Sequence, residues 1–182
     1  MLARVMRRGG SIARAGSVLR AGALARVLVL GVGALVVGAC AMQRAVEQRT
    51  THGPTSQQMF NLRVMTQSGR EPTFEEKRQW DEQTEQGISL YLRAHPEKAN
   101  ALDVSTFRFI RQVTVGMDKD QILILLGAPV AVTGDQAQMQ QIARGYWPGI
   151  QGNATELWIY PLGWNFFFAG PRLIDITQYL PP

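Results

Sequence analysis

The only cysteine of this 182-residue chain, Cys40, directly follows an apolar stretch. Residues 27–39 read VLVLGVGALVVGA and contain only apolar or small side chains. The stretch is shorter than the roughly 20 apolar residues that a membrane-spanning helix needs. It suits the apolar region of an export signal, which follows a positively charged start. Residues 1–39 are therefore predicted to be a signal peptide.

A single cysteine also limits what the rest of the chain can be. It excludes a disulfide framework, and one cysteine with two histidines cannot supply the four ligands of a Cys/His zinc site. The two histidines, His52 and His95, lie beside glycine or proline, and no pairing of a nucleophile with a base is evident. We therefore expect a protein that is not an enzyme and has no metal, cofactor or small-molecule substrate.

The residues around Cys40 form a known pattern. Val37-Gly38-Ala39-Cys40 resembles the lipobox of bacterial lipoproteins, in which one aliphatic and two small residues precede the cysteine. The resemblance implies that Cys40 is the lipid attachment site and carries several acyl chains, because one chain anchors a protein only weakly. Ala41 replaces the aspartate that signals retention at the inner membrane, which favours a lipid-anchored, periplasm-facing protein of the outer membrane. The alternatives are an ordinary secretory signal with an incidental cysteine, or an uncleaved anchor.

The net charge of +5 comes from the predicted signal peptide. Residues 1–39 hold six arginines and no acidic residue, so the remainder has 19 − 6 = 13 basic residues against 14 acidic ones. That remainder carries a charge near −1 and has no basic surface of the kind that binds a phosphate backbone. We therefore expect no nucleic-acid partner.

Two segments separate Cys40 from the most informative part of the sequence. Residues 40–72 are polar and show no sustained periodicity, which predicts a lipidated flexible tether, with a short strand within 59–66 as an alternative to coil there. Residues 73–102 are predicted to contain an amphipathic helix. Thr73 and Glu76 have the spacing of a capping box at its start, and Pro96 ends it.

The run VTVGMDKDQILILLGAP, residues 113–129, predicts a short helix between a turn and a strand. Gly116 suits the turn, and Asp118 with Gln121 forms a second capping box. Gly127 is expected at the left-handed position after the helix. Residues 155–160 alternate with a period of two, and residues 164–168 and 172–177 follow after short loops, which predicts three antiparallel strands in a meander. The fold class is therefore α+β, with helices packed on this sheet.

Together these motifs are similar to those of the SmpA/OmlA (BamE-like) family of outer-membrane lipoproteins, over about residues 103–182. The resemblance implies two helices on a three-stranded antiparallel sheet and no catalytic role. It also implies an accessory function in outer-membrane protein assembly or envelope integrity, through contacts with components of the assembly complex and with lipid. Gly163 replaces an arginine of the family, and residues 134–155 form an insertion. The residues that carry the motif are Gly116, Met117, Asp118, Gln121, Gly127, Pro129, Trp158 and Tyr160.

Five residues are candidates for contact with a partner. Val130 and Ile159 match family positions that touch partners, and Phe167 lies on the strand face opposite to the expected core. Tyr146 and Trp147 lie in the insertion, either as an exposed binding tip or, as we favour, as a lid that folds back over the sheet edge. The alternative function is a free-standing periplasmic adaptor or inhibitor. An exposed aromatic patch on the insertion, without a partner surface near Val130 and Ile159, would favour that alternative.

Overall fold

The computed structural model describes residues 45–98 and 102–181, all of which belong to one compact unit, Arg44–Pro182. Cys40 and the expected signal peptide lie outside these residues, so both stay predictions.

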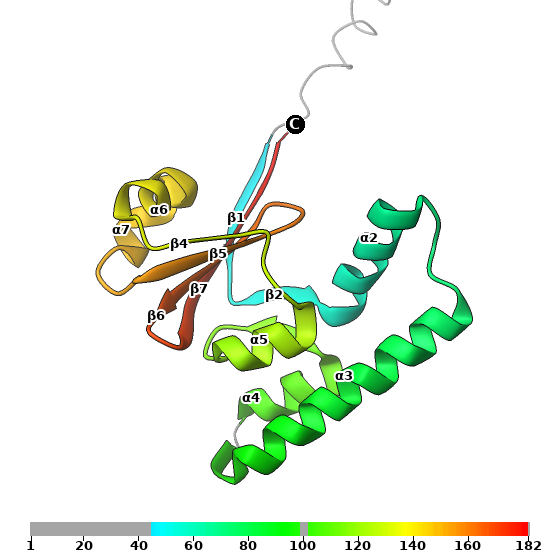
Figure 1. Ribbon diagram of the computed structural model, residues 1–182. Helices are drawn as coiled ribbons and strands as arrows, with labels where there is room; N and C mark the ends of the chain where they lie inside the picture. Colours follow the sequence, from blue (N-terminus) through cyan, green and yellow to red (C-terminus); the bar gives the residue numbers. More distant parts are fainter. Residues whose placement is uncertain (1–44, 99–101, 182) are drawn as a thin grey trace, which may run out of the picture. The chain divides into compact units, whose positions relative to one another are not determined.

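A five-stranded antiparallel sheet, in the order β1-β7-β6-β5-β4, is the main β structure (Figure 1). The α+β class is confirmed, and the three expected strands are present as consecutive neighbours. The expectation of only three strands is wrong, because one additional strand pairs at each edge. The strands of this sheet are β1 (Val46–Thr50), β4 (Ala131–Thr133), β5 (Glu156–Tyr160), β6 (Trp164–Ala169) and β7 (Arg172–Leu180).

The N-terminal part of the described chain differs from the expected flexible tether over 40–72. β1 pairs along β7 from Val46 to Thr50, and β2 (His52–Thr55) pairs with β3 (Gln112–Thr114) in a second, two-stranded sheet. The side chains of β1 are mostly exposed, so the strand has no apolar pattern to reveal it. Backbone pairing and polar side-chain bonds to β7 hold it in the sheet.

Residues 59–66 are neither strand nor coil, because they belong to the helix α2 (Ser56–Ser68). Thr55 and Gln58 close a capping box at its start, and the buried Met59 attaches it to the core. The helix has few buried residues, which explains why its sequence lacks a strong apolar stripe.

The expected amphipathic helix is confirmed as α3 (Phe74–Ala94), with its capping box between Thr73 and Glu76. A short 3-10 turn, η2 (Pro96–Lys98), follows it. Ile88 and Tyr91 of α3 lie in the same core cluster as the residues after 103. Helix α4 (Leu102–Ser105) continues into the π-helical turn η3 (Thr106–Ile110), and α5 (Lys119–Leu126) begins at the predicted capping box of Asp118 and Gln121.

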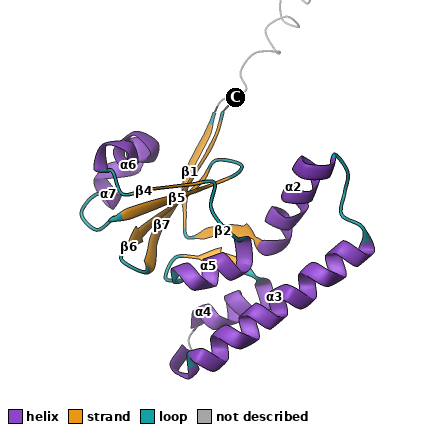
Figure 2. Cartoon of the chain, in the orientation of Figure 1, coloured by secondary structure: helices purple, strands orange, loops and turns teal. Residues whose placement is uncertain are grey.

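The sheet has a hydrophobic cluster on each face, because side chains alternate along its strands. Trp158 and Tyr160 of β5 join the first cluster, with α3 and α5, whereas Leu157 joins the second. The second cluster is covered by the insertion, which folds into α6 (Gln136–Ala143), the 3-10 turn η4 (Arg144–Tyr146) and α7 (Trp147–Ile150) (Figure 2). The insertion does fold back onto the sheet, as the favoured interpretation expected, but it covers the face that carries Leu157 and Phe167 and not the sheet edge.

Candidate functional site

The family-like motif residues build the fold. Met117 and Gln121 are fully buried, and Gly116 has a positive φ of 103°. Gly127 also has the expected positive φ, 76°, but its ψ of −166° lies outside the left-handed helical region. Pro129 is half-buried. These residues therefore position neighbouring surfaces and do not themselves present functional groups.

The candidate partner residues separate into buried and exposed ones. Phe167 is completely buried under the insertion, so its expected exposure is wrong; the insertion, whose position the strand pattern cannot reveal, covers that face. Trp147 is also buried, and the Tyr146 hydroxyl donates to the Glu47 carbonyl at 3.2 Å. Ile159 is half-buried against the second cluster. Only Val130, 72% exposed, presents its side chain to solvent.

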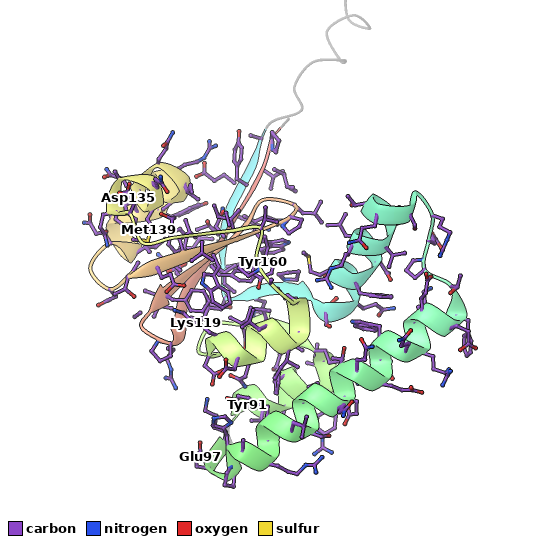
Figure 3. The ribbon with its side chains drawn as sticks, in the orientation of Figure 1. Tyr91, Glu97, Lys119, Asp135, Met139 and Tyr160 are labelled. Atoms are coloured by element: carbon purple, nitrogen blue, oxygen red, sulfur yellow. The ribbon has the colours of Figure 1, made fainter. Side chains whose placement is uncertain are left out.

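Val130 stands at the rim of a mainly apolar groove between α2 and the β5–β6 turn, which we call the Val130 groove. Its volume is about 330 Å³. The Tyr160 hydroxyl, labelled in Figure 3, donates to the Gly127 carbonyl at 2.7 Å, and burial raises the pKa of that tyrosine. Leu162, in the turn, is half exposed. The lining residues are Met59, Leu62, Arg63, Thr66, Gln67, Leu126, Ala128, Val130, Tyr160, Pro161 and Leu162.

A larger groove, of about 830 Å³, lies between α3 and η3 and was not expected from the sequence; we call it the Phe109 groove. Three large apolar side chains line it in contact with solvent: Phe74 is 77% exposed, Phe109 75% and Ile110 58%. Trp80, also in the lining, stacks on Phe60 with 4.9 Å between ring centroids. Exposed aromatic residues at a concave surface are typical of protein-binding sites.

The backbone beside the Phe109 groove is strained. Phe107 is completely buried, and the π-helical geometry of η3 then turns the following residues outward. Arg111 ends η3 with a φ of 53°, a left-handed conformation that costs a non-glycine residue about 1–2 kcal/mol. Its guanidinium forms ion pairs with Asp81 and Glu85 of α3. Strain and π-helical turns are both enriched at functional sites.

The charges along the Phe109 groove favour an acidic partner. Both acidic residues in its lining, Asp81 and Glu85, are already paired with Arg111. Lys77 and Arg108 also line it, and neither forms an ion pair with any side chain in the part of the chain that the structure describes. Arg108 instead lies over the ring of Phe109, 5.3 Å from its centroid. The groove thus combines exposed apolar surface with available positive charge.

A partly buried polar cluster connects the end of α3 to the start of α5. Tyr91 (Figure 3) and Lys98 both donate to the Asp118 carboxylate, and Lys98 Nζ lies 2.6 Å from the tyrosine hydroxyl. Burial, followed by the hydrogen bond to Asp118, raises the pKa of Tyr91 to about 12. Asp118 also caps α5, so the cluster has a structural role. The described residues contain no group of three or more His, Cys, Asp or Glu side chains able to hold a metal ion.

Two further searches, one for membrane-spanning helices and one for similar proteins, found nothing that identifies the site. Within residues 45–98 and 102–181, no helix has the length and apolar character needed to cross a bilayer. Comparison with family models, characterised proteins and solved structures finds no match to this chain.

Proposed function

We propose that this chain is a non-enzymatic lipoprotein of the outer membrane, anchored through Cys40 and facing the periplasm. Its role is that of an accessory factor in outer-membrane protein assembly or envelope integrity, exerted by binding another protein. The lipobox-like residues and the SmpA/OmlA-like motif support the anchor and the role.

The main observation in favour of the accessory role is the exposure of Val130 at the rim of the Val130 groove. This residue matches a partner-contacting position of the family that the sequence resembles. The aromatic residues of the insertion do not form an exposed binding tip, because Trp147 is buried and the Tyr146 hydroxyl is bonded to β1.

The second candidate function is a free-standing periplasmic adaptor or inhibitor, and the Phe109 groove favours it. This groove is formed in large part by α3, which lies before the family-like region, and its charge suits an acidic segment carrying apolar side chains. The two functions therefore depend on two different surfaces.

The two surfaces allow one experiment to separate the functions. The tagged lipoprotein is isolated from its own membranes in mild detergent, and the proteins that accompany it are identified by mass spectrometry. Val130→Asp and Phe109→Asp are matched variants, since each places one carboxylate at a strongly exposed apolar position.

The accessory role would be supported if the parent protein and Phe109→Asp both bring down the barrel protein of the assembly complex and Val130→Asp does not. Recovery of another periplasmic protein, lost only in Phe109→Asp, would support the adaptor. A parent protein that brings no partner with it would contradict both.

A further inference from the structure

The spacing between Cys40 and the first strand is short. Only residues 41–45 separate Cys40 from Val46, where β1 begins. An extended chain advances at most about 3.6 Å per residue, so the six steps between these two residues span no more than about 22 Å. An acylated Cys40 would therefore hold the start of β1 close to the lipid surface, whereas a flexible tether over the whole of 40–72 would not.

Several chain segments meet at this end of the sheet. Val46 pairs with Leu180 near the C-terminus, and Figure 1 shows the start of β1 beside the end of β7. The β5–β6 turn joins them, because the Tyr179 amide donates to the Gly163 carbonyl at 3.0 Å. We call the region formed by Val46, Leu162 and Leu180 the anchor-side end.

The anchor-side end exposes apolar side chains at positions where polar residues are usual. Val46 is 51% exposed and Leu162 is 50% exposed. Leu162 also has a φ of 59°, in a turn where glycine, asparagine or aspartate is the common choice. Glu47, exposed on β1, and Arg144, over the ring of Tyr179 at 3.5 Å, contribute one charge of each sign beside it. Among the residues that the structure describes, this end is therefore apolar, with one charge of each sign beside it.

We propose that the anchor-side end rests on the membrane surface, with Val46, Leu162 and Leu180 in contact with lipid. This orientation rests on the proposed acylation of Cys40. Apolar side chains flanked by few charges partition into the interface between lipid headgroups and acyl chains. The sheet then stands on the membrane, and the β6–β7 turn at its other end is raised by the length of β6, about 20 Å at 3.3 Å per residue.

The test uses the acylated full-length lipoprotein, reconstituted into vesicles of phosphatidylethanolamine and phosphatidylglycerol. Acylation blocks the thiol of Cys40, the only native cysteine, so Leu162→Cys provides one free thiol for an environment-sensitive fluorophore. Arg172→Cys is the matched control, because Arg172 is exposed at the β6–β7 turn. Val46→Cys provides a second probe at the anchor-side end.

We expect lipids that carry a spin label near the headgroup to quench the fluorophore at 162 and at 46 at least twofold more than at 172. Equal quenching at all three positions, or stronger quenching at 172, would overturn the orientation while leaving the anchor intact. Mass spectrometry of the N-terminal peptide is measured on the same preparation. An N-terminal peptide without acyl groups on Cys40 would overturn the anchor itself, and the orientation with it.

Discussion

Arg49 on the first strand forms an ion pair with Asp175 on the last one. The Arg49 Nε lies 3.0 Å from each carboxylate oxygen, and its Nη2 also donates to Oδ2. The Asp175 residue is only 6% exposed, whereas the Arg49 side chain is 44% exposed. The arginine thus neutralises a nearly buried carboxylate and fixes β1 to β7.

Replacing Arg49 with methionine should lower the free energy of unfolding by about 2 kcal/mol, because Asp175 would stay buried without its partner. Urea denaturation of the domain measures this loss. Arg78→Met is the control, since Arg78 pairs with Glu75 and Glu82 at an exposed site and such pairs contribute under about 1 kcal/mol. Equal losses in the two variants would contradict a structural role for the β1–β7 pair.

Asp118 should make the stability of the domain depend on pH. Burial alone would raise the pKa of its carboxyl, but hydrogen bonds from Lys98 and Tyr91 outweigh burial and hold that pKa below its usual value. A lowered pKa means that the contribution is present above about pH 4, the unfolded value, and is lost as the pH falls through the folded value. Asp118→Asn should therefore melt well below the parent at pH 7, with the difference shrinking below pH 4. Asp120→Asn, exposed in the same helical turn, is the control for removing a carboxylate near the start of α5. A difference between Asp118→Asn and the parent that stays constant with pH would refute the prediction.

Gly127→Ala should destabilise the domain by about 1–3 kcal/mol, because its φ of 76° and ψ of −166° are accessible almost only to glycine. A Cβ there would also lie 2.8 Å from Nη2 of Arg63, which donates to the Leu126 carbonyl and cannot move without losing that bond. Gly152→Ala is the matched control, since open space surrounds Gly152. Chemical denaturation of both variants tests the prediction, and similar midpoints would show that the conformation at 127 is not required.

Trp147→Ala should cost about 3–4 kcal/mol, the usual loss for truncating a buried aromatic residue. Its side chain packs with Ile150 and Phe167 in the second cluster. Tyr146→Phe should cost no more than about 1 kcal/mol, since it removes a single hydrogen bond. Thermal melts compare the two variants, and a Trp147→Ala protein as stable as the parent would mean that the insertion does not act as a lid.

Local signals predicted the helices α3 and α5 and the strands β5, β6 and β7. The capping boxes at Thr73 and Asp118 depend on residues three positions apart, and the alternation in β5 depends on a repeat of two. Such patterns can be recognised in the sequence because the residues that produce them are neighbours in the chain.

The strand β1 and the Phe109 groove depend on contacts between distant residues. β1 exposes most of its side chains and is recognisable only through its pairing with β7, more than 100 residues later. Phe109 and Ile110 are exposed at the end of the π-helical turn η3, a backbone geometry that no residue spacing in the sequence indicates. Phe74 gave no such signal, because it is the first residue of α3 and has the same helical angle as Leu92, which packs against the core; it is nevertheless 77% exposed.

The pairing of β1 with β7 has a mechanical consequence. If Cys40 is held in the membrane and a bound partner pulls the domain away, the load enters at Val46 and runs along β1. The backbone hydrogen bonds of an antiparallel pair are perpendicular to the strands. A load along β1 therefore strains all the hydrogen bonds between β1 and β7 at once and does not open them one after another. These bonds join the residue pairs from Val46↔Leu180 to Thr50↔Ile176. The strand next to the anchor is thus oriented to resist tension between the membrane and a partner.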